Sequence, residues 1–240
     1  MRFTTKPNVR RKAMIDTTPQ IIALVTGASR GIGAATAVAL AKAGYHLILT
    51  GRSEPRLAEV EGQIHGAGGT ATIAPFDLTD SDAIDRLASA IGGRWGKLDV
   101  LVLNAGQLGT LSPLAHIAPK DWDKVLAVNL TANWRLLKAF DPWLRLSSAA
   151  EVVALTSSVG AAPRANWGTY AVSKAALDSL IAIYGQEVGA ISSIRTHTIN
   201  PGATRTLMRE NAFPGEDPQT VKPPEDVAAM IIAAIGAHRA

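Results

Sequence analysis

The chain has 240 residues, enough for one well-buried core and too few for two ordinary catalytic domains. Its 47% apolar and 18% charged residues fit a soluble α/β protein. It has no cysteine, which excludes disulfides, a thiolate nucleophile and a cysteine-ligated metal, and its five histidines are scattered without metal-ligand spacing, so we expect no metal site.

The net charge of +4 belongs to the first 20 residues, which hold five basic side chains and one acidic one. The rest of the chain is neutral, so we expect no nucleic-acid partner. No apolar run approaches the ~20 residues of a membrane span, and none precedes Ile21 as a secretory signal would. We expect a cytoplasmic protein in which residues 1–20 form a flexible basic extension. Residues 1–13 belong to it only if Met14 is not the true initiator.

From residue 21 onward, short β-branched apolar runs alternate with alanine-rich segments of helical length. This alternation predicts a single-domain, Rossmann-type doubly wound parallel sheet over residues 21–240, with its binding site at the carboxyl ends of the strands. The expected strands are 21–26, 46–50, 70–76, 100–103, 152–156 and 193–199. The expected helices are 31–44, 54–66, 80–94, 119–147, 168–189 and one near 223–236.

The first strand runs into a glycine-rich turn that opens a helix. Glycines at such a turn let the backbone approach a pyrophosphate placed at the helix N-terminus. The alternative is an ordinary glycine-rich loop, but the strand, turn and helix together favour a dinucleotide site. The residues expected to contact the cofactor here are Gly27, Ser29, Arg30, Gly31, Ile32 and Gly33.

The end of the second strand indicates which nicotinamide cofactor is used. A carboxylate there would bind the ribose of NAD, but the sequence has Gly51 followed by Arg52 and Ser53. Arg52, with Arg30 in the glycine turn, can hold the 2′-phosphate of NADP. The alternative is that both are solvated surface arginines. We expect NADP(H) rather than NAD(H).

Three residues in the second half suggest carbonyl reduction. Ser157 follows a strand, and Tyr170 and Lys174 are four positions apart, on one face of a helix. A tyrosine titrates near pH ~10, so it must be tuned downward to donate a proton at neutral pH, and a lysine one turn away can do so by its charge. Ser157 can hold the carbonyl oxygen beside the phenol.

These features resemble, in their order, the classical short-chain dehydrogenase/reductase family, and the resemblance covers residues 20–206. It implies that Asp77 and Leu78 contact the adenine and that Asn129 holds a proton-relay water beside Lys174. It also implies that Lys174 binds the nicotinamide ribose. Further cofactor contacts implied are Asn104, Ala105 and Gly106 around the pocket, and Pro201, Gly202, Thr204 and Thr206 towards the carboxamide.

The segment 164–168 and the region 204–214 are similar to a bacterial branch typified by YciK. Family members usually have a seventh strand after the last helix, and because this chain stops at Ala240 we expect six. The resemblance implies pairing of helices 119–147 and 168–189 across a two-fold axis. Their extra apolar residues favour a homodimer, although they could also be helix surface of a monomer.

Residues 203–222 are polar and proline-bearing and are expected to form a substrate lid. Arg164, Trp167, Arg205 and Arg209 are candidate substrate ligands for a carboxylate or phosphate beside an apolar wall. In the alternative, Trp167 packs the helix start and the arginines pair with nearby carboxylates.

The sequence therefore predicts an NADP(H)-dependent oxidoreductase that interconverts a small carbonyl substrate and its alcohol, with Tyr170 as general acid and base. The alternative is a non-catalytic NADP(H)-binding regulator. Such a protein has no need for Ser157, Tyr170 and Lys174 in register, and all three are present.

Overall fold

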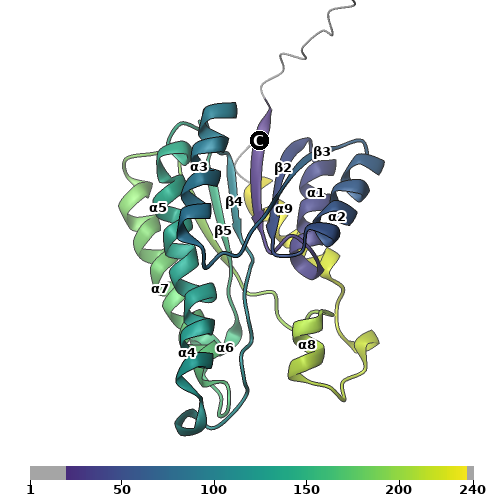
Figure 1. Ribbon diagram of the computed structural model, residues 1–240, viewed down its shortest axis with the longest axis vertical. Coiled ribbons are helices and arrows are strands. Elements are labelled where there is room, and N and C mark those ends of the chain that lie inside the picture. The colour runs from purple at the N-terminus through teal and green to yellow at the C-terminus, as the bar shows by residue number, and fades with distance from the viewer. Residues whose placement is uncertain (1–19, 237–240) are drawn as a thin grey trace, which may run out of the picture.

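The protein is described by a computed structural model that covers residues 20–236, and in it one parallel sheet stands between two layers of helices (Figure 1). The sheet has the order β3-β2-β1-β4-β5-β6, which confirms the expected Rossmann-type fold. Each predicted strand lies within two residues of the observed one. The strands are β1 (Ile21–Thr26), β2 (Tyr45–Gly51), β3 (Thr70–Pro75), β4 (Val100–Leu103), β5 (Glu151–Leu155) and β6 (Arg195–Ile199).

The helices divide between the two faces of the sheet (Figure 1). Alternate residues of β1 show why two cores form: Ile22 and Leu24 belong to one buried cluster, and Ala23 and Val25 to the other. One face carries α1 (Gly31–Lys42), α2 (Glu54–Gly66) and α9 (Pro224–Gly236). The other carries α3 (Ser81–Trp95), α4 (Pro119–Leu126), α5 (Ala132–Leu144) and α7 (Gly168–Gly189).

The segment predicted as a helix over 119–147 is helical from Pro119 to Leu144, but its helical pitch changes in the middle. α4 ends at Leu126, a π-helical turn, η2 (Ala127–Thr131), follows, and α5 begins at Ala132. The Asn133 side chain donates to the Asn129 carbonyl at 2.7 Å, supporting the widened turn. Such turns occur frequently at functional sites, and here the turn holds Asn129.

Two short helices and a 3₁₀ turn lie at the end where the strands finish: α6 (Ser158–Ala161), α8 (Leu207–Ala212) and η3 (Pro218–Thr220). α8 and η3 belong to the expected lid, residues 203–222. A further 3₁₀ turn, η1 (Leu114–His116), precedes α4. The predicted basic extension lies outside the described residues, apart from Gln20. None of the described helices is long and apolar enough to cross a membrane.

Candidate active site

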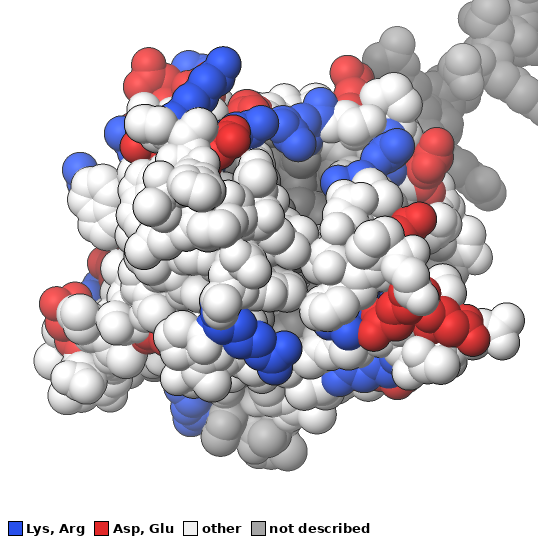
Figure 2. All heavy atoms as spheres, turned by 90° about the horizontal axis from the view of Figure 1, so that it is seen from below, with Lys and Arg blue, Asp and Glu red and all other residues white. Residues whose placement is uncertain are grey.

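A cavity of approximately 530 Å³ opens at the carboxyl ends of the strands, within the range of small-molecule sites. Figure 2 views this end of the molecule, where most of the surface is uncharged and the basic side chains stand in separate groups. Most of the predicted cofactor residues line the cavity: Gly27, Ser29, Arg30, Gly31, Ile32, Arg52, Asp77, Leu78, Asn104, Ala105, Gly106, Tyr170, Lys174, Pro201 and Thr206. Four others, Gly33, Ser53, Gly202 and Thr204, lie outside its lining.

The glycine turn is fixed by its neighbours. Gly27 and Gly31 have φ angles of 64° and 55°, which favour glycine. A Cβ on Gly33 would overlap the Gly27 carbonyl oxygen. The Asn104 side chain donates to the carbonyls of Thr26 and Gly27 at 2.8 and 3.2 Å, so the turn and the loop after β4 are held together.

The start of α1 fits an anionic group. Its N-cap, Arg30, makes no side-chain cap hydrogen bond, and its first turn holds no acidic residue. The first backbone N–H groups of a helix have no partner within the helix and carry partial positive charge. Together with the glycine cradle, they match the donors that a pyrophosphate requires.

Two arginines, Arg30 and Arg52, line the cavity near the end of β2. Gly51 ends β2 beside Ser29, whose Oγ would be 3.6 Å from a Cβ added at Gly51. Arg30 and Arg52 are exposed, and within residues 20–236 neither forms an ion pair with a carboxylate. The site thus offers two available guanidinium groups and no carboxylate at Gly51, which suits a phosphate better than a ribose hydroxyl.

Asp77 also lines the cavity. The Thr79 backbone N–H donates to Asp77 Oδ1 at 2.9 Å, and this bond is the main reason why the pKa of Asp77 is lowered from its ordinary value. Arg52 lowers it slightly further. Asp77 is therefore an ionised acceptor at neutral pH, with Leu78 buried next to it.

Tyr170 and Lys174 reach the cavity from one face of α7, and both are buried, with 8% and 4% of their surface exposed. Lys174 Nζ donates to the Leu155 carbonyl at 2.6 Å. Ser157 follows β5 and makes a side-chain hydrogen bond with Tyr170. It lies beside a smaller neighbouring cavity of approximately 390 Å³, and Thr156 lines both.

The pKa shifts differ from the expectation for the phenol. Burial raises the pKa of Tyr170, and the hydrogen bond with Ser157 opposes the rise. The predicted lowering by Lys174 is not what the structure shows, because its ammonium lies 5.8 Å from the tyrosine ring centre and donates to a backbone carbonyl. Burial lowers the pKa of Lys174 to about 8, so the strongest shift in this pair falls on the lysine.

Asn129 connects the loop after β4 to α7. Its Oδ1 accepts from the Gln107 N–H at 2.7 Å, and its Nδ2 donates to the Gln107 carbonyl and to Ser173 Oγ, both at 2.9 Å. A Cβ on Gly106 would be 3.5 Å from Asn129 Oδ1 and 3.8 Å from Lys174 Nζ. Asn129 therefore lies within the Lys174 environment, while its role in proton relay stays a prediction.

The four candidate substrate residues differ in whether they line the cavity and in what they contact. Arg205 lines the cavity, whereas Arg164 is exposed and does not. Arg209 forms an ion pair with Glu216, the alternative considered from sequence, so we do not carry it forward as a substrate ligand. Trp167 precedes α7 and contacts the ring of Tyr170.

Some residues of the site were missed by sequence reasoning. Thr26 Oγ1 donates to the Val102 carbonyl and accepts from the N–H groups of Asn104 and Ala105. Its position at a strand end before a glycine turn was the available signal. Gln107 and Met208 also line the cavity, and the sequence held no signal for them, because they reach the site only through contacts between distant segments. No group of metal ligands occurs within the described part of the chain.

Comparisons with known proteins point to one family. A family model described as short chain dehydrogenase matches residues 21–217. A protein of Escherichia coli named as the uncharacterized oxidoreductase YciK is 38% identical over 218 residues, which are 90% of this chain and 86% of the relative.

Solved structures of related proteins have a similar fold. A protein designated a short chain dehydrogenase from Shigella flexneri, complexed with NADP, has a TM-score of 0.86 and 38% identity, covering 90% of each chain. One from Escherichia coli, complexed with NADPH, has the same TM-score, identity and coverage.

The buried ammonium of Lys174 should cost stability. Its pKa falls from 10.5 to about 8 on folding, so at pH 7 the charged form is disfavoured by about 3 kcal/mol. We expect Lys174→Met to raise the free energy of unfolding at pH 7 by roughly 1–3 kcal/mol, part of the gain being lost with the bond to Leu155.

The gain should be full below pH 8 and should vanish as the pH rises towards 10.5, where the wild-type lysine is neutral in both states. Urea unfolding at pH 7 and pH 10 measures it, with exposed Lys120→Met as the control. A less stable Lys174→Met protein at pH 7 would show that the contacts of the ammonium outweigh its burial.

Proposed function

The chain belongs to the short-chain dehydrogenase family, and we propose that it is an NADP(H)-dependent oxidoreductase interconverting a carbonyl compound and its alcohol. The observation that carries this proposal is the meeting of Tyr170 and Lys174 with the glycine turn in one cavity, with Ser157 bonded to the phenol. A pure cofactor-binding protein would have no use for this arrangement.

The proposed cofactor site uses the groups described above. The N-terminus of α1 and the glycine turn hold the pyrophosphate, Asp77 and Leu78 border the adenine, and Lys174 holds the nicotinamide ribose. Two solved relatives contain NADP or NADPH, which supports NADP(H). When bound, the nicotinamide supplies or accepts the hydride.

The protein's own residues manage the proton. Ser157 and Tyr170 would both hydrogen-bond the carbonyl oxygen, and the phenol would donate its proton as that oxygen gains charge. Because burial raises the pKa of Tyr170, the phenol is fully protonated at neutral pH and ready to act as an acid. The Lys174 ammonium, with a pKa of about 8 and its Nζ 5.8 Å from the centre of the Tyr170 ring, would return a proton to the phenolate that remains.

Arg30 and Arg52 lead us to expect a preference for NADP(H) over NAD(H). Arg52→Asp removes a cation and adds a repulsive carboxylate beside the 2′-phosphate. It should weaken NADPH binding by about tenfold or more, because a charged hydrogen bond contributes ~1.5–3 kcal/mol, and leave NADH binding unchanged or improved. Cofactor fluorescence titration measures both. Tighter NADH than NADPH binding by the wild type would contradict the preference.

The acid assignment is tested by Tyr170→Phe. We expect kcat to fall by roughly 10²–10⁴-fold, the usual contribution of a positioned acid, while the NADPH dissociation constant changes little. Oxidation of NADPH with a panel of ketones and aldehydes measures the rate. If the variant keeps more than about a tenth of wild-type kcat, another group donates the proton.

We propose that the protein forms a homodimer through α5 and α7. Val172 and Ile183 are exposed by 44% and 55%, and they lie eleven positions apart, three turns along one face of α7. Trp134 on α5 is 48% exposed. An apolar surface on two long helices of the same layer favours a symmetric contact that would bury it.

Light scattering should give a mass near twice 25.1 kDa. Ile183→Arg should shift the protein to the monomer, because the contact would bury an unpaired charge. Ile191→Arg, at an exposed position just beyond α7, is the matched control and should leave the dimer intact. A wild-type mass of one or four times 25.1 kDa contradicts this proposal.

A further inference from the structure

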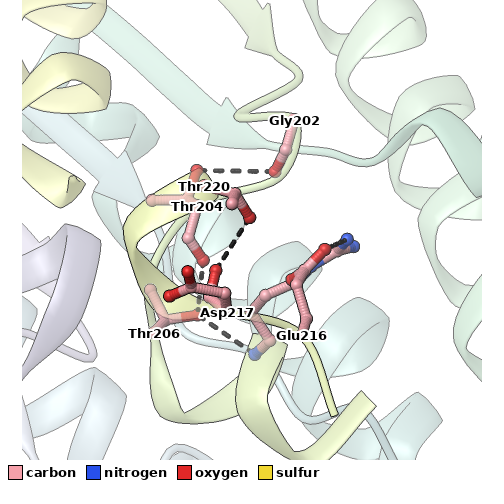
Figure 3. A network of polar contacts seen from close by, with 7 residues as sticks. Gly202, Thr204, Thr206, Glu216, Asp217 and Thr220 are labelled. Atoms are coloured by element: carbon pink, nitrogen blue, oxygen red, sulfur yellow. Dashed lines mark hydrogen bonds and ion pairs between the residues drawn. The ribbon is translucent and has the colours of Figure 1, made fainter. Parts of the chain in front are cut away.

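The segment between β6 and α9 forms a loop that fixes its own shape. Thr204 and Lys222 form a strand-like bridge, and the Arg205 N–H donates to the Lys222 carbonyl at 2.9 Å. Within the loop, Thr206 Oγ1 caps α8 by accepting from the Arg209 N–H at 3.2 Å (Figure 3). Because Leu207 and Met208 line the cavity, this closed loop supplies one of its walls.

The side chain of Arg209 makes an ion pair and a ring contact within this loop. Its Nε and Nη2 donate to the two carboxylate oxygens of Glu216 at 2.6 and 2.5 Å (Figure 3). Its guanidinium carbon lies 3.6 Å from the centre of the Phe213 ring. A guanidinium held in a fork by one carboxylate has little capacity for another anion. Arg209 therefore acts as a clamp that fixes Phe213 after α8.

Phe213 continues a row of aromatic rings that reaches the proposed acid. The ring centres of Phe213 and Trp167 are 5.8 Å apart, and those of Trp167 and Tyr170 are 6.0 Å apart, both within the range of favourable aromatic pairs. Leu108 and Met208 pack against the same small cluster as Trp167. We call these four apolar side chains the apolar wall: Trp167, Phe213, Leu108 and Met208.

The wall and its surroundings distinguish between two kinds of substrate. A carboxylate or phosphate would need an available cation next to Tyr170, and Arg209, on the same loop as Phe213, is already paired with Glu216. Of the candidate arginines, Arg205 lines the cavity and is exposed, so a preference for pyruvate would assign it to the substrate carboxylate.

Trp167 and Phe213 do not line the cavity themselves, but Met208 does, and the Trp167 ring contacts Tyr170. A group attached to a carbonyl at Tyr170 would therefore lie next to these apolar side chains.

We propose that Trp167 and Phe213 determine specificity, and that the preferred substrates are carbonyl compounds with an uncharged apolar ring next to the reacting carbon. This inference rests on the proposed function, because it assumes that Tyr170 serves a carbonyl group. It assigns the clamp of Arg209 and Glu216 a positioning role, since the two residues act through Phe213.

The test compares kcat/KM, with NADPH, for methyl phenyl ketone, 2-butanone and pyruvate. The wild type should prefer the phenyl ketone to each of the others by roughly tenfold or more, the scale of discrimination that apolar pockets reach. Phe213→Ala should remove most of that preference by lowering kcat/KM for the phenyl ketone, with 2-butanone changed by less than about threefold. NADPH affinity should stay the same.

The clamp has a matched control. Arg209→Gln should reduce the preference for the ring, because it frees Phe213, and it should act mainly on KM. Arg145→Gln breaks a comparable ion pair, with Asp141 at 2.8 Å, near the end of α5. It should change neither the preference nor KM. Phe213→Leu keeps apolar volume and should give an intermediate preference if the alanine variant does not fold.

The outcomes separate the two proposals. If the wild type reduces carbonyl compounds but prefers pyruvate, or if Phe213→Ala and Phe213→Leu keep the wild-type preference, the inference about the wall is overturned and the proposed function stands. If the wild type oxidises NADPH with none of a broad panel of carbonyl compounds, the proposed function itself is overturned.

Discussion

The hydrogen bonds of Thr26 and Asn104 join the ends of β1 and β4, and the rest of the site depends on them. These neighbouring strands lie where the sheet order reverses, the point at which a doubly wound sheet opens a crevice. Thr26 binds three backbone groups of the β4 end, and Asn104 binds the backbone of the glycine turn. One side of the cavity is thereby fixed by hydrogen bonds to backbone groups.

Another side of the cavity is formed by α7, and there the burial of a charged group lowers the stability of the fold. Lys174 is buried against the Leu155 carbonyl, and Asn129 and Ser173 form a polar network beside it. A core of the same volume made of apolar side chains would be easier to stabilise. The widened helical turn at Asn129 belongs to the same arrangement, because it brings the Asn129 amide to Gln107 and Ser173 in one place.

The sequence predicted those parts of the protein that depend on local patterns. Apolar periodicity located the strands and α7, and the order of motifs located the glycine turn and Tyr170. It did not predict the π-helical turn after Leu126, because one widened turn inside a continuous helix has no residue-type signal of its own. It also did not predict Phe213, which meets Trp167 only through the folding of a loop 46 residues further along the chain. Arg209 was ambiguous, since paired and unpaired arginines look alike in a sequence.

The outermost strand, β6, has a consequence for how the protein behaves at high concentration. In the described part of the chain it borders β5 on one side only, and an open strand edge can pair with another molecule. Its residues Arg195, Thr196, His197 and Thr198 are charged or polar, unlike those of the central strands. Such side chains are a known defence against edge-to-edge aggregation. The polar side chains of β6 thus help to keep separate molecules from joining their sheets.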